Sequence, residues 1–234
     1  MVRAEINKRT PLRIFEKSIH GGVGKGNIGV LASRKGVGKT ACLVHIAMDK
    51  LFQGKHVIHV SFSSRVDHIV TWYEDIFKEI AKKRNLESAV EVHDEIIKNR
   101  VIMNFNQKGV SVESILHSVS AMVKDGHFAA DCIIIDGYDI QQSQPGDLKV
   151  IRDFVADLGI EVWASISLKG EEPIFDEKGF PRELAGFMDE LAVVVTLQYK
   201  GDHVELAVVK DHDSRNLAEM NLMLDPKTLL IVEK

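Results

Sequence analysis

Apolar residues in this chain gather into short runs that alternate with longer stretches in which apolar and polar residues repeat at helical spacing. The runs predict strands at 27–32, 56–62, 101–105, 132–135 and 160–166. The stretches between them predict helices at 39–51, 66–83, 86–98, 112–123 and 148–158. The run 132–135 is apolar without interruption, as expected of a strand covered on both faces. Such alternation predicts an α/β protein with a mostly parallel sheet.

The pattern changes near residue 190. Three apolar runs at 191–197, 204–209 and 220–224 follow one another closely and are joined by short polar segments. Lys200, Gly201 and Asp202 predict a hairpin turn between the first two runs. We therefore expect antiparallel strands to extend the parallel sheet. No segment has the composition of a linker, so we predict a single domain over 1–234.

Composition narrows the class of protein. Of the 234 residues, 45% are hydrophobic and 27% are charged, which excludes a disordered or fibrous chain. A net charge of −4 argues against a generic nucleic-acid coat, and no apolar run approaches the ~20 residues of a membrane span. Met1–Glu5 lacks an apolar signal core, and Cys42 and Cys132 lie inside apolar segments without zinc-ligand spacing. We expect a cytoplasmic protein with buried thiols.

The most informative segment joins the first predicted strand to the first predicted helix. It consists of Ser33, Arg34, Lys35, Gly36, Val37, Gly38, Lys39 and Thr40. This matches the phosphate-binding loop G-x-x-x-x-G-K-[ST] except at the first position, where Ser33 replaces glycine. Gly36 and Gly38 allow the backbone N–H groups to approach a phosphate closely. The segment predicts binding of ATP or ADP, and a glycine-rich turn without a ligand is the alternative.

Two residues are candidates for binding the Mg²⁺ that accompanies a nucleotide. The Thr40 hydroxyl follows Lys39, whose side chain can reach the β- and γ-phosphates. Asp136 ends the buried run 132–135 and brings a carboxylate to the sheet edge where ligands of open α/β sheets bind. The alternative for Asp136 is a residue that caps the next loop. Its position after a buried strand, together with the phosphate loop, favours the magnesium role.

With these motifs, nearly the whole chain resembles the RecA-like P-loop ATPase superfamily, in the branch of KaiC-type proteins and DnaB-type helicase motors. The matching segments are 10–12, 21–26, 32–47, 135–138, 162–168, 186–194 and 208–212. The resemblance implies a three-layer RecA-like fold with nucleotide bound at the strand C-termini. It also implies that Lys210 belongs to a Lys-x-Arg pair which, in ring-forming members, reaches the γ-phosphate bound by the neighbouring subunit.

The chain departs from this family at positions that serve hydrolysis. Ser63 stands where the family has its catalytic glutamate, and Ser167 stands at the sensor position. His212 replaces the arginine of the Lys-x-Arg pair. Serine cannot activate water as a carboxylate does, and histidine lacks the guanidinium fork. Glu74, Asp75 and Asp139 are substitutes that the sequence leaves open.

These features predict an ATP-binding protein with weak or absent hydrolysis, in a regulatory or assembly role, with a homo-oligomeric ring or filament as the assembly that the resemblance implies. One alternative is an active DNA-dependent recombinase- or helicase-type ATPase. Nucleic-acid binding is not favoured, because the loop 170–181 carries Glu171, Glu172, Asp176 and Glu177, and the basic residues Arg65 and 82–84 fit a solvated face. The other alternative is an interaction module without nucleotide.

Overall fold

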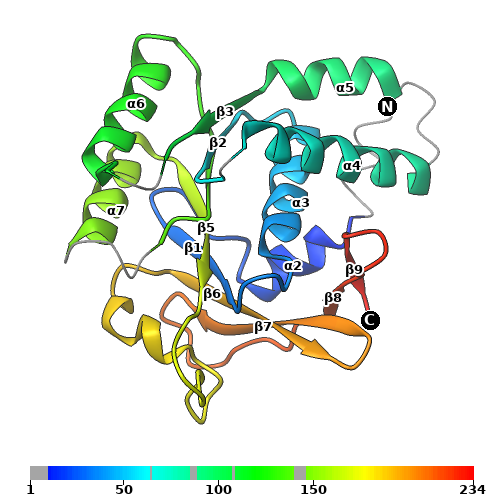
Figure 1. Ribbon diagram of the computed structural model, residues 1–234, viewed down its shortest axis with the longest axis vertical. Coiled ribbons are helices and arrows are strands. Elements are labelled where there is room, and N and C mark those ends of the chain that lie inside the picture. The colour runs from blue at the N-terminus through cyan, green and yellow to red at the C-terminus, as the bar shows by residue number, and fades with distance from the viewer. Residues whose placement is uncertain (1–9, 64, 85–88, 107–108, 140–145) are drawn as a thin grey trace.

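The computed structural model describes residues 10–63, 65–84, 89–106, 109–139 and 146–234. Within them the chain forms one nine-stranded mixed sheet of order β3-β2-β4-β5-β1-β6-β7-β8-β9 (Figure 1). The strands are β1 (Ile28–Ser33), β2 (Val57–Ser61), β3 (Arg100–Asn104), β4 (Cys132–Asp136), β5 (Glu161–Ser167), β6 (Val193–Lys200), β7 (His203–Asp211), β8 (Leu222–Leu224) and β9 (Ile231–Glu233). The protein is therefore an α/β protein, as predicted.

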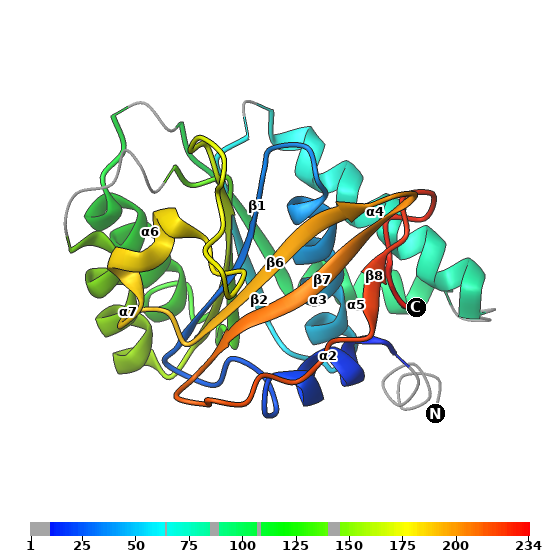
Figure 2. The ribbon, with the colours of Figure 1, turned by 90° about the horizontal axis from the view of Figure 1, so that it is seen from below.

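Helices cover both faces of the sheet (Figures 1 and 2). They are α2 (Leu12–Ser18), α3 (Lys39–Phe52), α4 (Val66–Arg84), α5 (Ala89–Lys98), α6 (Val112–Lys124), α7 (Asp147–Leu158) and a 3₁₀ helix η2 (Arg182–Phe187). One apolar cluster joins α2, α3, α4 and α5 to one face, and a second joins α6, α7 and η2 to the other. None of the described helices combines the length and apolar character that a membrane crossing requires.

The alternation of side-chain directions along each strand produces these two apolar clusters. In β1, Val30 and Ala32 contribute to the α6–α7 side, whereas Leu31 contributes to the α3 side. Successive side chains of a strand point to opposite faces, so an apolar run without interruption supplies both layers. Cys42 and Cys132 are free and buried, which confirms the prediction of buried thiols.

The six strands from β3 to β6 are parallel. The carboxyl ends of these strands therefore lie along one edge of the sheet, and the segments that follow them meet there. β1 lies between β5 and β6, and β5 separates β1 from β4. Asp136 at the end of β4 and the phosphate loop after β1 are thus brought to the same edge from strands that are not neighbours.

The last strands run antiparallel to their neighbours, as predicted. The turn at Lys200–His203 joins β6 to β7, and a register shift between Val194 and Val195 marks a bulge in this hairpin. The predicted strands and helices match observed elements with boundaries that differ by a few residues. The predicted helix 86–98 is observed as α5 from Ala89, and its first three residues lie outside the described residues. The predictions omitted α2, η2 and β9.

Candidate functional site

The phosphate-loop segment connects β1 to α3. β1 ends at Ser33 and α3 begins at Lys39. Gly36 and Gly38 have φ angles of +84° and +116°, a region that favours glycine. Gly38 is the N-cap of α3, and the loop therefore lies at the positive end of the helix dipole, where anions bind favourably.

Lys39 lies inside the loop and is buried. Its Nζ donates to the backbone oxygens of Ser33 (3.1 Å) and Arg34 (2.9 Å) and to the Ser33 Oγ (3.2 Å). Burial lowers the pKa of Lys39 to about 8, although the nearby Asp136 opposes this shift. Ser33, which replaces the glycine of the motif, therefore adds a side-chain contact that holds the lysine within the loop.

Thr40 and Asp136 are 96 residues apart in sequence and in direct contact. The Thr40 Oγ1 donates to the Asp136 Oδ2 at 2.8 Å. The other carboxylate oxygen, Oδ1, accepts a hydrogen bond of 2.7 Å from the Ser165 hydroxyl of β5. The structure thus brings together the two residues that the sequence analysis named as candidate magnesium ligands. It also places Ser165, which the sequence analysis missed, in contact with Asp136.

The oxygen atoms of Thr40 and Asp136 fit Mg²⁺, which prefers oxygen ligands. In proteins this ion is bound by one or two carboxylates together with substrate phosphates and water. In the described part of the chain, no group of three or more His, Cys, Asp or Glu side chains could hold a metal ion by itself. A magnesium ion at this site would therefore depend on phosphate oxygens for the rest of its coordination.

A cavity of about 520 Å³ opens above these residues. The polar end, as we call it, consists of the loop residues 35–40 with Asp136, Gly137 and Ser165. The apolar end consists of Ile69 and Trp72 of α4 with Val204, Leu224, Pro226 and Leu229 of the C-terminal region. Figure 2 shows the β6–β7 hairpin and β8 beside α3 and α4, which explains how residues so distant in sequence share one cavity.

The two ends meet where Leu224 packs on the phosphate loop. A Cβ placed on Gly38 would lie 2.3 Å from the Leu224 Cδ2, so the end of the Leu224 side chain would have to move to admit one. Leu229 has a φ of +58°, a conformation that bulky residues seldom adopt. Backbone hydrogen bonds between Asp225 and Leu229 and between Asp225 and Leu230 hold the loop that carries it.

Ser63 and Ser167 both line the cavity. The backbone N–H of Ser63 donates to the Ser61 Oγ at 3.1 Å, and its carbonyl accepts from the Asn104 side chain at 3.2 Å. Ser63 thus lines the cavity with a hydroxyl, which is a poor general base at neutral pH.

Asp136 is the one carboxylate among the described residues that line the cavity. The three substitutes that the sequence left open pair elsewhere: Glu74 with His93, Asp75 with Lys78, and Asp139 with Lys169. None of the three lines the cavity. Among the described residues, therefore, no second acid lines the cavity.

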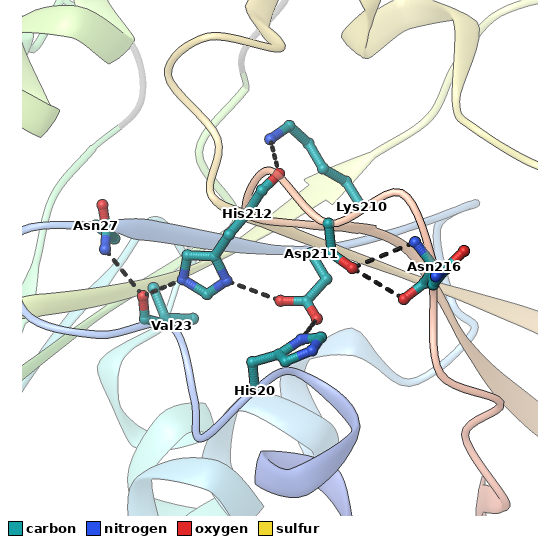
Figure 3. A network of polar contacts seen from close by, with 8 residues as sticks. His20, Val23, Asn27, Lys210, Asp211, His212 and Asn216 are labelled. Atoms are coloured by element: carbon teal, nitrogen blue, oxygen red, sulfur yellow. Dashed lines mark hydrogen bonds and ion pairs between the residues drawn. The ribbon is translucent and has the colours of Figure 1, made fainter.

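Lys210 lies away from the cavity. β7 runs antiparallel to β6, so its last residues reach the edge of the sheet opposite to the phosphate loop. The Lys210 Nζ donates to the backbone oxygen of His212 at 3.0 Å (Figure 3). The His212 ring contacts the Asp211 Oδ1 at 2.7 Å and the Val23 oxygen at 3.0 Å, and His20 contacts the other oxygen of Asp211. Lys210 could thus reach only a nucleotide bound by another copy of the chain.

The acidic loop 170–181 lies next to the phosphate loop. Arg34 donates to the Glu172 carboxylate at 2.9 Å, and Arg34 does not line the cavity. The four carboxylates of this loop are all exposed: Glu171, Glu172, Asp176 and Glu177. Of the basic residues considered for a nucleic-acid face, Arg65 pairs with Asp67, Lys82 and Lys83 are exposed, and the side chain of Arg84 lies outside the described residues.

Comparison with known proteins finds no matching family model and no curated protein that is significantly similar to the chain.

Proposed function

We propose that this protein binds ATP or ADP together with Mg²⁺ on a RecA-like P-loop fold of the KaiC/DnaB type, and that it hydrolyses ATP weakly or not at all. The observation that carries the proposal is the meeting of Lys39, Thr40 and Asp136 at one end of a 520 Å³ cavity. A buried cation, a hydroxyl and a carboxylate beside a helix N-terminus are the groups that a magnesium-bound phosphate chain requires.

The state of Lys39 supports phosphate as its ligand. Its Nζ is held by three oxygens of its own loop, two of them carbonyls, and burial lowers its pKa. Phosphate oxygens would give this buried ammonium the countercharge that carbonyl oxygens lack. The lysine is therefore preorganised within the loop, and an anion bound there would stabilise its charged form.

The apolar end of the cavity supports a nucleoside as the remainder of the ligand. Ligand pockets commonly have volumes of ~300–1,000 Å³ and combine an apolar wall with a few polar groups. Here Trp72, Leu224 and Leu229 could contact a base while the phosphates lie on the loop. Inorganic phosphate alone would leave this wall without a ligand.

The surroundings of the cavity support weak hydrolysis and a regulatory or assembly role. Phosphoryl transfer to water needs a group that orients or activates the water, and Ser63 supplies only a hydroxyl. No observation favours a DNA-dependent ATPase, because the loop beside the phosphate loop exposes four carboxylates, which repel nucleic-acid phosphates. An interaction module without nucleotide would leave the preformed polar end without a role.

The proposal is tested by isothermal titration of the protein with ATP–Mg²⁺ and ADP–Mg²⁺. The wild type should bind, and Lys39→Ala should weaken binding about 10- to 150-fold, since hydrogen bonds to a charged group contribute ~1.5–3 kcal/mol. Lys124→Ala removes an exposed lysine at the end of α6 and serves as the charge control. Absence of binding at millimolar nucleotide would overturn the proposal.

Hydrolysis is measured separately as steady phosphate release from ATP. We expect slow release that single-stranded DNA does not stimulate, because no second carboxylate lines the described cavity. Strong stimulation by DNA would instead identify the active DNA-dependent ATPase.

A further inference from the structure

We propose that Ser165 is a positioning residue that holds Asp136 in the orientation needed to bind magnesium. This inference rests on the proposed nucleotide function and assigns a role to a residue to which the sequence analysis gave none. Ser165 lies on β5, the strand between β4, which carries Asp136, and β1, which leads into the phosphate loop. It is 3% exposed and lines the polar end of the cavity.

The direction of the hydroxyl proton follows from the two contacts of Ser165. The backbone N–H of Gly137 donates to the Ser165 Oγ at 2.9 Å, so the serine oxygen acts as the acceptor in that bond. A serine hydroxyl has one proton to donate. Its other partner, the Asp136 Oδ1 at 2.7 Å, is an acceptor, and the proton must therefore point toward the carboxylate.

Gly137 makes this arrangement possible. Its φ is +86°, which turns the chain directly after β4 and allows its N–H to point back toward Ser165. A side chain at this position would meet the Phe62 Cβ at an ordinary 3.7 Å, so the requirement for glycine comes from the backbone angle and not from crowding. The turn and the serine thus act together on the carboxylate.

The two oxygens of Asp136 are therefore held from opposite sides. Ser165 of β5 binds Oδ1 and Thr40 of α3 binds Oδ2. The Thr40 contact joins the hydroxyl and the carboxylate oxygen that are both expected to bind magnesium, whereas the Ser165 contact lies on the other carboxylate oxygen. The Ser165 contact need not change when the ion arrives. Ser165 can therefore keep the carboxylate from rotating in both the free and the bound site.

Partners that orient a metal ligand contribute strongly to metal affinity, and their removal typically lowers it about 10- to 100-fold. The experiment measures ATP affinity by isothermal titration, first in EDTA and then over a range of Mg²⁺ concentrations. In Ser165→Ala we expect ATP binding in EDTA to remain within about twofold of the wild type. The Mg²⁺ concentration that gives half of the full gain in ATP affinity should rise about 10-fold or more in this variant. Asp136→Asn removes the carboxylate itself and should abolish the gain in ATP affinity from Mg²⁺, so it gives the reference for complete loss.

Thr196 supplies the control. It is a fully buried hydroxyl residue of β6, it does not line the cavity, and its Oγ1 donates to the backbone oxygen of Ala207 at 3.5 Å. Thr196→Val should keep the Mg²⁺ dependence of the wild type. Ser165→Thr retains a hydroxyl and should restore most of the Mg²⁺ effect, which separates loss of the hydrogen bond from loss of packing.

The outcomes distinguish this inference from the proposed function. If the wild type binds no nucleotide in EDTA or in Mg²⁺, the proposed function fails and the role of Ser165 fails with it. If the wild type gains affinity from Mg²⁺ and Ser165→Ala gains it equally at the same Mg²⁺ concentration, only the role of Ser165 is overturned. Equal losses in Ser165→Ala and Thr196→Val would also overturn it, because they would indicate a general disturbance of the sheet.

Discussion

The two ends of the cavity are built in different ways. At the polar end, Asp136 at the end of β4, Ser165 on β5 and Lys39 at the start of α3 come together, and hydrogen bonds to described partners hold each of them. At the apolar end, α4 and the C-terminal strands meet through packing of side chains such as Trp72 and Leu224. The polar end should therefore supply most of the affinity, while the apolar end should decide which group may follow the phosphates.

The largest expected effect is a dependence of ATP affinity on pH, and it belongs to the polar end. The pKa of Lys39 is lowered to about 8 without ligand, and bound phosphate would raise it again. Below pH 8 the lysine is charged in both states, so its contribution to affinity is constant. Above pH 8 binding must take up a proton, and affinity should fall about tenfold per pH unit. Titrations with ATP–Mg²⁺ at pH 7, 8, 9 and 9.5 measure this slope.

The control for this slope is Lys39→Arg, whose guanidinium stays charged over the whole range. Any binding that this variant retains should lose the slope above pH 8. A wild-type affinity that stays constant to pH 9.5 would contradict the lowered pKa of Lys39 in the free protein.

A smaller effect is expected at the apolar end. Leu229→Ala removes part of the wall, and we expect ATP affinity to fall about three- to tenfold, equivalent to about 1 kcal/mol of apolar contact. Binding of inorganic triphosphate, measured by competition, should not change, because that ligand has no group to place on this wall. Leu217→Ala, an exposed leucine outside the cavity lining, is the control. Equal losses for both ligands would contradict the division of the cavity into two ends.

The smallest effect is expected for Lys210→Ala. Because Lys210 contacts the backbone of His212 and lies outside the cavity, ATP affinity in dilute protein should stay within about twofold of the wild type. If Lys210 reaches the nucleotide bound by a neighbouring subunit, as the resemblance implies, the variant should differ from the wild type only in assembled protein. Size-exclusion chromatography with and without ATP would detect such assemblies. A loss of affinity in the monomer would place the lysine at its own nucleotide.

Much of the polar end could be predicted from the sequence, because its elements are local in the chain. The phosphate loop is continuous, and Asp136 ends an apolar run that identifies its strand. Parallel strands bring their carboxyl ends to one edge, so the contact between Thr40 and Asp136 follows once both segments are recognised. The available signal for Ser165 was a polar residue within a buried run, and its role depends on β5 pairing with β4.

The apolar end could not be predicted, because it depends on the packing of segments far apart in the chain. β9 has three residues, too few for a periodic pattern to identify it, and α2 has seven. Leu224 was interpreted only as the end of a predicted strand, and Leu229 was not interpreted. Nothing in the local pattern of either residue indicates a ligand. The contact of Leu224 with Gly38 exists only once β8 has joined β7.

That contact has a consequence for how this protein can change in evolution. Position 38 requires glycine because of its φ of +116°, and a side chain there would also displace the end of Leu224. A smaller residue at 224 would relieve the crowding but not the backbone strain, so no single compensating substitution there can make alanine acceptable at 38. The glycine is therefore constrained by the backbone of the phosphate loop itself, whereas the side chain at 224 has only to pack against it.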